Sequence, residues 1–191
     1  YNLVLGSFFS NLQYDYDNKY YVSASWRTDG SSRFGKNNRW ATFWSVGGKY
    51  RVSSEKFMEP TKSWLTDLTL RASYGTTGNQ DVGDHTDADY YSWIVARDIY
   101  GYGYNYAGQP GSRHEQFGSA DLKWEKTGKF NVGFDATLFN RVFLTFDYYS
   151  HKTTDMVFAV PVSYLTGLSE YYKNIGSLSN KGVEFSVGVN I

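Results

Sequence analysis

The sequence predicts an all-β fold: an antiparallel, up-and-down sheet of about seven strands, of the kind that forms the wall of a transmembrane β-barrel. Three observations favour this fold class. Apolar and polar residues alternate with the period of a strand along much of the chain. Tyr, Phe and Trp, which favour strands, make up 19% of the 191 residues. No apolar run approaches the ~20 residues that a membrane-spanning helix requires.

Seven segments carry this alternation and are the predicted strands. Several exceed the about five or six residues of an ordinary globular strand and reach the ~9–11 residues of a tilted membrane strand. In chain order the segments are Leu3–Tyr16, Tyr20–Asp29, Trp40–Val52, Leu68–Gly75, Leu122–Leu138, Val142–Lys152 and Gly182–Ile191.

Of the first four segments, the second, third and fourth divide into an apolar and a polar face. The first segment ends at the turn Asp17–Lys19, whose residues favour tight turns. In the next three, the apolar face carries Val22, Ala24, Trp26, Trp44, Val46, Tyr50, Val52, Leu68, Leu70, Ala72 and Tyr74. The opposite face carries Ser23, Ser25, Arg27, Asp29, Ser45, Lys49, Arg51, Thr69, Arg71 and Ser73.

The last three segments divide in the same way, with Phe143 and Tyr149 as exceptions on the polar side. Their apolar face carries Phe130, Val132, Phe134, Ala136, Leu138, Val142, Leu144, Phe146, Tyr148, Val183, Phe185, Val187 and Val189. Their polar face carries Lys129, Asn131, Asp135, Thr137, Thr145, Asp147, His151, Glu184, Ser186 and Asn190.

The charges of the central strand regions all fall on the polar face, whereas Lys126 and Lys152 fall on the apolar face but towards the loop ends, where a long side chain can reach the interface. The charges on the polar face are Arg27, Asp29, Lys49, Arg51, Arg71, Lys129, Asp135, Asp147 and Glu184. A Lys or Arg at the bilayer midplane on a lipid-facing position costs roughly 2–4 kcal/mol, so a charge-free face suits contact with lipid. In a barrel, the lumen-facing candidates are therefore Arg27, Lys49, Arg71, Asp135, Asp147 and Glu184. The residues expected to point outward to lipid are Val46, Leu70, Val132, Phe134, Leu144, Phe185 and Val187.

The connections alternate in length. Two are tight turns, Asp17–Lys19 and Phe139–Arg141, and three are long loops, Gly30–Arg39, Gly78–Ala120 and Ala159–Lys181. Short turns at one end and long loops at the other are typical of outer-membrane barrels, in which the long loops are extracellular.

The remaining connection, Ser53–Asp67, must then lie on the side of the tight turns despite its length. It contains a plausible short helix, Glu55–Met58, followed by a proline. Its apolar residues Phe57, Trp64 and Leu65 are expected to anchor it against the rim.

Alternation alone also fits a soluble β-sandwich with a Tyr-rich ligand-binding loop, because antiparallel sheets commonly have one solvated face. Strand length favours the membrane, as does a tyrosine girdle around the first tight turn, where rings would lie in the headgroup layer. The girdle residues are Tyr14, Tyr16, Tyr20 and Tyr21.

The bulk composition excludes several classes of function. A formal net charge of zero argues against a nucleic-acid partner. The absence of cysteine excludes a disulfide framework and a thiolate metal site. The chain begins inside a strand pattern without a signal peptide, so we expect it to be a piece of a longer protein.

Four segments resemble signatures of the SusC/RagA-type TonB-dependent outer-membrane transporters. RTDGSSRFGKNNRW at Arg27–Trp40, LTDLTLRASYGTTGNQ at Leu65–Gln80, DLKWEKT at Asp121–Thr127 and NIGSLSNKGVEFSV at Asn174–Val187 occur in that family's order with similar gaps. The resemblance covers nearly the whole chain. It departs from the family pattern at Thr28, where a basic residue is common, and in the aromatic-Pro-Ser motif, which reads Phe-Trp-Ser here.

The resemblance implies a barrel of about 22 strands that imports a nutrient, a glycan or a peptide, across the bacterial outer membrane. It implies a plug domain through which TonB acts, a SusD-like surface lipoprotein as partner, outer-membrane lipid around the wall, and neither a cofactor nor enzymatic activity. Seven strands cannot close such a barrel. Residues 1–191 are therefore expected to be a partial barrel domain that lacks the plug and the remaining strands.

The long loop Gly78–Ala120 holds the candidates for substrate contact. They are Trp93, Tyr100, Tyr102, Tyr104 and Tyr106. Tyrosine at every second position would place the four rings on one side of an extended segment, with glycines between them. The same row would also suit packing within the loop or docking of the lipoprotein.

The loop opens with an acidic run, Asp81–Asp89, whose four aspartates could in principle hold Ca²⁺. Their spacing does not match an EF-hand, so a solvated acidic loop is the interpretation and no metal is predicted. The three histidines, His85, His114 and His151, are scattered and form no catalytic motif.

Overall fold

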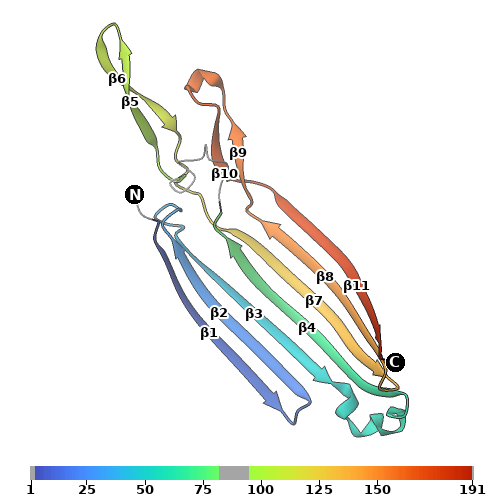
Figure 1. Ribbon diagram of the computed structural model, residues 1–191. Helices are drawn as coiled ribbons and strands as arrows, with labels where there is room; N and C mark the ends of the chain where they lie inside the picture. Colours follow the sequence, from blue (N-terminus) through green and yellow to red (C-terminus); the bar gives the residue numbers. More distant parts are fainter. Residues whose placement is uncertain (1–2, 82–94, 191) are drawn as a thin grey trace.

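The computed structural model describes residues 3–81 and 95–190. Seven long strands form one antiparallel sheet in which each strand pairs with its neighbour in the chain (Figure 1). The sheet confirms the predicted fold class and strand order. Its strands are β1 (Leu5–Tyr16), β2 (Tyr20–Ser31), β3 (Trp40–Arg51), β4 (Leu65–Asn79), β7 (Glu125–Leu138), β8 (Val142–Thr154) and β11 (Ser177–Val189). No helix among the described residues is long and apolar enough to cross a membrane.

Two hairpins that the sequence analysis did not predict lie inside the long loops. β5 (Ile99–Tyr106) pairs with β6 (Gln109–Gln116), and β9 (Val157–Pro161) pairs with β10 (Glu170–Asn174). Both hairpins extend beyond the same end of the large sheet (Figure 1). The turn η3 (Tyr164–Thr166) forms the tip of the second hairpin.

The two tight connections at the opposite end are type I′ turns. Their central residues have positive φ: 54° at Asp17, 50° at Asn18, 52° at Phe139 and 57° at Asn140. An N–H···O=C bond of 3.0 Å joins the first and fourth residues of each turn. This turn type suits the right-handed twist of the flanking strands and favours Asn, Asp and Gly. Phe139 is therefore an unusual choice of residue.

The connection between β3 and β4 contains two 3₁₀ turns rather than the predicted helix Glu55–Met58. They are η1 (Val52–Ser54) and η2 (Lys56–Thr61), and between them Glu55 is extended, with φ −80° and ψ 146°. The proline within η2 has no N–H to donate, which disfavours a regular helix. As predicted, the segment lies at the end of the sheet that carries the tight turns (Figure 1).

The strand register assigns side chains to the two faces. Lys49 on β3 lies opposite Arg71 on β4, and Arg71 lies opposite Gly133 on β7. Gly133 in turn lies opposite Asp147 on β8, which lies opposite Glu184 on β11. Directly paired residues of an antiparallel sheet share a face. The register therefore puts on one polar face the charges Arg27, Asp29, Lys49, Arg51, Arg71, Lys129, Asp135, Asp147 and Glu184.

The other face is apolar and uncovered. Leu12 is 66% exposed and Phe185 is 65% exposed, and most other large apolar side chains of this face are exposed as well. Within residues 3–81 and 95–190 no second sheet packs on this face. A soluble β-sandwich would bury it, so this arrangement does not favour the sandwich alternative.

The buried apolar core is small and lies at the loop end of the sheet. It consists of Phe34, Phe43, Val95, Leu122 and Trp124. Phe34 comes from the β2–β3 loop, and Leu122 and Trp124 come from the segment just before β7. The core thus fixes the loops to the sheet, while the long strands are held mainly by their hydrogen-bonded ladders.

Candidate functional site

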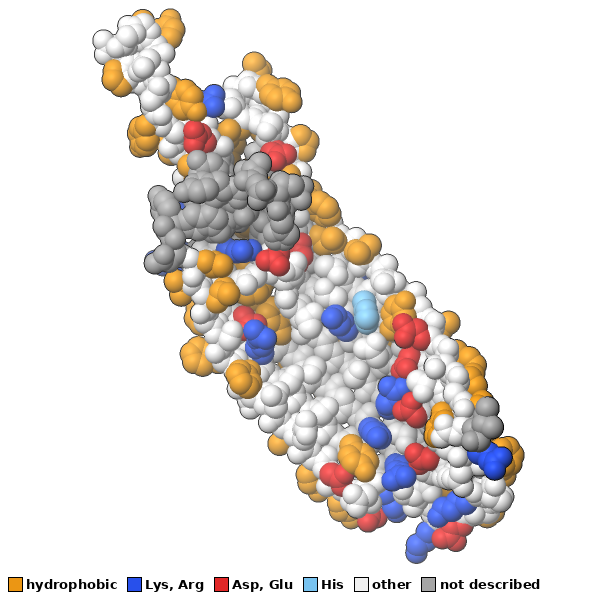
Figure 2. All heavy atoms as spheres, viewed as in Figure 1, with side chains coloured by type: hydrophobic (Ala, Val, Ile, Leu, Met, Phe, Trp, Pro, Cys, Tyr) orange, Lys and Arg blue, Asp and Glu red, His pale blue; other side chains and the backbone are white. Residues whose placement is uncertain are grey.

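The polar face carries a group of ion pairs centred on β4, β7 and β8, which we call the Arg71 cluster: Arg71, Asp135 and Asp147. Arg71 Nε lies 2.8 Å from Asp135 Oδ2, and its Nη2 lies 3.1 Å from Asp147 Oδ2. Thr145 Oγ1 donates to Asp135 Oδ1 at 3.0 Å. One guanidinium therefore bridges two carboxylates from neighbouring strands. Figure 2 shows charged side chains gathered along this face.

An open hollow of about 530 Å³ lies beside the Arg71 cluster. Its lining includes Lys49, Ser73 and Asn131, together with Tyr21 from β2. The Lys49 ammonium lies 5.4 Å from the centre of the Tyr21 ring, a cation–π distance. Tyr21 thus belongs to the polar face, and its assignment to an interfacial girdle is wrong: the register places only Tyr14, Tyr16 and Tyr20 on the apolar face.

The six candidate lumen charges share the polar face but differ in their partners. Arg27 Nε lies 2.6 Å from Asp29 Oδ1 on its own strand. Among the described residues Lys49 and Glu184 form no ion pair. Glu184 is on β11, the last strand of the sheet.

The buried core at the loop end is organised around Trp124. Its ring centre lies 5.1 Å from that of Phe34 and 5.9 Å from that of Phe43. Its indole N–H donates to the carbonyl of Arg39 at 3.0 Å. Gly78 leaves the space that the Phe43 ring occupies. Three of the four signature segments therefore meet in this core.

Two polar side chains that the sequence analysis missed join the β9–β10 hairpin to the sheet. Asn174 Nδ2 donates to the carbonyls of Lys123, at 2.8 Å, and Asp155, at 2.7 Å. Glu125 accepts from the Val157 amide at 2.8 Å through Oε1 and from a β4 asparagine at 2.9 Å through Oε2. Both residues lie in signature segments, which is the signal that could have identified them.

The tyrosine row of β5 does not lie on one side, so that part of the prediction is wrong. The pairing with β6 shifts register between Tyr102 and Tyr104, and Gly103 there has φ 92°. This β-bulge inserts one extra residue, which reverses the alternation. Tyr100 and Tyr102 therefore share one face of the hairpin, and Tyr104 and Tyr106 share the other.

The two faces of this hairpin have different chemistry. Tyr104 donates to Glu115 Oε1 at 3.0 Å, and the Arg113 guanidinium lies 4.2 Å from the centre of its ring. On the other face Tyr100 contacts His114 with ring centres 4.1 Å apart. Tyr102 and Tyr106 are 83% and 87% exposed. The fifth candidate, Trp93, lies outside the described residues.

The acidic run is described only at its start, where Asp81 Oδ1 lies 3.1 Å from Arg33 Nη1. Asp84, Asp87, Asp89 and His85 lie outside the described residues. Within the described part of the chain, no group of three or more side chains could hold a metal ion. His151 lies 3.3 Å from the Asn131 side chain.

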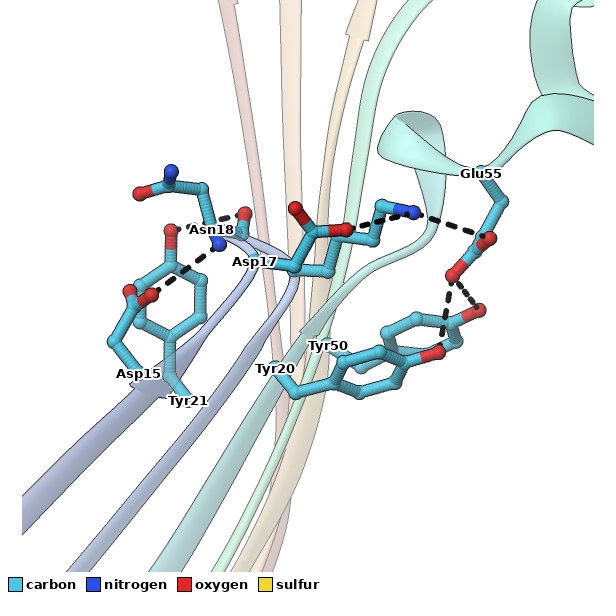
Figure 3. Close-up of polar contacts among 8 residues, drawn as sticks. Asp15, Asp17, Asn18, Tyr20, Tyr21, Tyr50 and Glu55 are labelled. Carbon is cyan, nitrogen blue, oxygen red and sulfur yellow. Dashed lines mark hydrogen bonds and ion pairs between the residues drawn. The ribbon is translucent and has the colours of Figure 1, made fainter.

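The tight-turn end carries a polar group that we call the Glu55 cluster: Lys19, Tyr20, Tyr50 and Glu55 (Figure 3). Glu55 Oε1 accepts from the hydroxyls of Tyr20, at 3.0 Å, and Tyr50, at 3.3 Å. Lys19 Nζ lies 3.3 Å from Asp17 Oδ2 and 3.6 Å from Glu55 Oε2. The hydrogen bond with Asp17 and the nearby Glu55 carboxylate raise the pKa of the Lys19 ammonium above its ordinary value.

Further contacts hold the same β3–β4 connection close to the sheet. Asp67 accepts from Ser53 Oγ and pairs with Arg51 Nε at 3.0 Å. The Phe139 amide donates to the Trp64 carbonyl at 2.9 Å. The connection between β3 and β4 is therefore joined to the β1–β2 turn near its start and to the β7–β8 turn near its end.

Residues 3–190 match the family described as "TonB dependent receptor-like, beta-barrel". The chain is 38% identical over 184 residues to "TonB-dependent receptor P39" of Formosa agariphila, covering 96% of this chain and 17% of that protein. It is also 38% identical over 186 residues to "TonB-dependent receptor SusC" of Bacteroides thetaiotaomicron, covering 96% of this chain and 18% of that protein.

Among solved structures, the RagAB peptide importer in its closed-closed state is similar, with a TM-score of 0.84 and 37% identity. The match covers 98% of this chain and 20% of that chain. The chain thus spans about a fifth of the length of the proteins that it matches.

Proposed function

This chain belongs to the family of TonB-dependent receptor β-barrels, whose members are outer-membrane proteins, and on that premise we propose that it is part of the wall of a SusC/RagA-type importer. The proposed activity is uptake of a glycan or a peptide across the bacterial outer membrane, driven by TonB.

One observation carries this proposal: the two faces of the sheet differ sharply in charge. The exposed apolar face carries only three charges on the described long strands, Lys126, Lys152 and Lys181, all in the loop half of the last three strands, whereas the polar face carries the nine charges of the central strand regions. Barrel strands alternate between lipid and lumen, and a charge on the lipid side is costly. We therefore assign the apolar face to lipid and the polar face, with Arg27, Lys49, Arg71, Asp135, Asp147 and Glu184, to the lumen.

The whole importer requires parts beyond these seven strands. A large plugged barrel of this kind has about 22 strands. In the proposal the remaining strands and the plug domain belong to the same longer protein, and TonB acts through the plug. A SusD-like surface lipoprotein would cap the loop end, where the two hairpins extend. In the proposal, transport proceeds by conformational change of the plug, without a catalytic step or a cofactor.

The hairpin β5–β6 is the proposed contact for substrate, together with Trp93. Exposed Tyr102 and Tyr106 lie on opposite faces of the hairpin, so two surfaces are available. One of them combines an aromatic ring with a guanidinium and a carboxylate, through Tyr104, Arg113 and Glu115. Such a surface can both stack on a ring and hydrogen-bond polar groups, which suits a sugar or a peptide.

Uptake by the full-length protein tests the proposal. Cells that carry the intact gene should grow on the cognate glycan or peptide mixture, and cells that lack it should not. Loss of growth must also follow deletion of TonB. Growth that persists in both deletions would refute the import function.

A further inference from the structure

We propose that the apolar face carries, at the tight-turn end, a site for one phospholipid with a zwitterionic ethanolamine headgroup. This inference rests on the proposed function, because it requires the apolar face to meet the bilayer and the tight turns to lie at the periplasmic leaflet. The site has two parts, a hollow for an acyl chain and a charged group for the headgroup.

The first part is an open hollow of about 600 Å³ on the apolar face. Its floor is low because small residues occupy the middle of a cross-strand row: Val22, Gly48, Ala72 and Val132 are successive partners across β2, β3, β4 and β7. Larger side chains form the neighbouring row on the tight-turn side of this low row: Tyr20, Tyr50, Leu70, Phe134 and Phe146. A low row beside such a ridge on a lipid-facing surface suits the close packing of an extended hydrocarbon chain.

The second part is the Glu55 cluster, which adjoins the hollow directly. The rings of Tyr20 and Tyr50 line the hollow and stack with centres 4.9 Å apart and planes 5° from parallel. Their hydroxyls point the other way, to the Glu55 carboxylate (Figure 3). The stacked tyrosines therefore connect the apolar hollow to a fixed anion, beside which lies the ammonium of Lys19.

The charges of this cluster match a zwitterionic headgroup. Lys19 can meet the lipid phosphate, while Glu55 and the neighbouring Asp17 can meet the ethanolamine ammonium. The side chains of Lys19 and Glu55 are 22% and 19% exposed, so each is mostly covered by neighbouring residues but still reaches the surface. One cation beside two carboxylates gives a net negative charge, which disfavours the anionic phosphatidylglycerol and the phosphorylated lipopolysaccharide. The complementarity thus selects phosphatidylethanolamine.

Native mass spectrometry of the full-length transporter in detergent tests this site. After delipidation, the protein is titrated with dioleoylphosphatidylethanolamine and, separately, with dioleoylphosphatidylglycerol. We expect one bound phosphatidylethanolamine, held about three- to fivefold more tightly than phosphatidylglycerol, because one partly exposed ion pair is worth up to ~1 kcal/mol.

Two variants test the contact with the headgroup and the contact with the acyl chain separately. Glu55→Gln keeps an oxygen that accepts from both tyrosines but removes the charge, so the preference should fall to within about twofold. Gly48→Leu fills the hollow, and a Cβ there meets no atom closer than the Tyr21 carbonyl oxygen at 4.0 Å. This substitution should weaken the binding of both lipids to the same extent. The matched control is Val46→Phe, which adds bulk on the same strand and face outside the hollow and should change neither affinity.

Equal binding of the two lipids by the unaltered protein would overturn the proposal, and so would an unchanged preference in Glu55→Gln or unchanged affinity in Gly48→Leu. Preferential retention of lipopolysaccharide would overturn it as well, since this end would then face the outer leaflet. A difference in gel migration between heated and unheated samples checks that each variant is a folded barrel. Nutrient uptake is measured separately: a protein that imports but shows no lipid preference refutes this site alone, and one that binds phosphatidylethanolamine but imports nothing refutes the import function alone.

Discussion

The side chain of Asn174 pairs with the backbone of Lys123 as a strand neighbour would: its Nδ2 donates to the Lys123 carbonyl at 2.8 Å, and its Oδ1 accepts from the Lys123 amide at 2.9 Å. A third bond, from Nδ2 to the Asp155 carbonyl, completes the contact. One amide therefore fixes the end of β10 to the segment that leads into β7.

Replacing this amide should loosen the β9–β10 hairpin without unfolding the barrel. Asn174→Ala leaves two backbone carbonyls and one backbone N–H without their partner, and each such loss costs about 1–3 kcal/mol where the group is buried. Hydrogen exchange measured by mass spectrometry should show faster exchange over Val157–Asn174 and no change in β1–β4. Asn180→Ala on β11, which is exposed, serves as the control. Unchanged hairpin exchange would show that the contact does not hold the hairpin.

The Arg71 cluster should stabilise the wall by coupling three strands. Arg71→Ala leaves the carboxylates of Asp135 and Asp147 near each other without their shared cation. Because these groups are partly exposed, we expect a loss of about 1–2 kcal/mol for the network. A double-mutant cycle with Asp147→Ala, followed by urea unfolding in detergent or lipid vesicles, measures the coupling. A coupling energy of zero would mean that the pair contributes nothing.

Phe139 should be a suboptimal turn residue. It has φ 52° in a type I′ turn, a conformation that costs a non-glycine L-residue roughly 1–2 kcal/mol and that asparagine tolerates better. Phe139→Asn should therefore stabilise the barrel by about 0.5–1 kcal/mol in detergent unfolding experiments. A decrease in stability would show that the exposed ring contributes more, through the membrane interface, than its backbone conformation costs.

The exposed tyrosines of the β5–β6 hairpin should contribute to binding of substrate. Replacing Tyr102 and Tyr106 together with serine in the full-length transporter should weaken substrate binding about tenfold, since stacking is worth ~1–3 kcal/mol per ring for nucleobases and less for sugars. Calorimetry with the cognate glycan or peptide measures this, and pull-down of the lipoprotein provides the control. If binding is unchanged while the lipoprotein is lost, the tyrosines form a partner interface.

The large sheet was predictable because its signal is local. The long strands from β2 to β11 alternate between apolar and polar residues, with Phe143 and Tyr149 as exceptions, and the register of the sheet keeps that alternation in phase. The small hairpins carry no such contrast: Ile99–Tyr106 alternates tyrosine with glycine, and Val157–Pro161 is short and ends in proline. Local pattern therefore identified the wall but not the structures at its rim.

The candidate site was predictable in its faces but not in its contacts. The alternation of side chains along each strand placed Arg71, Asp135 and Asp147 on one face. Their mutual pairing depends instead on which strands are neighbours across the long loop. The bulge at Gly103 depends on the partner strand β6, so a simple count of alternate residues put four tyrosines on one side. In both cases a pairing between distant segments decided the outcome.

Site-directed spin labelling tests the assignment of one face to lipid and the other to the lumen. Asn131 and Val132 are neighbours on β7 with side chains on opposite faces, and these 191 residues contain no cysteine to interfere with labelling. In the full-length transporter in lipid vesicles, a label at position 132 should be accessible to oxygen and protected from a water-soluble nickel complex, and a label at position 131 should show the reverse. Equal accessibility of the two labels to both reagents would refute this assignment of the faces.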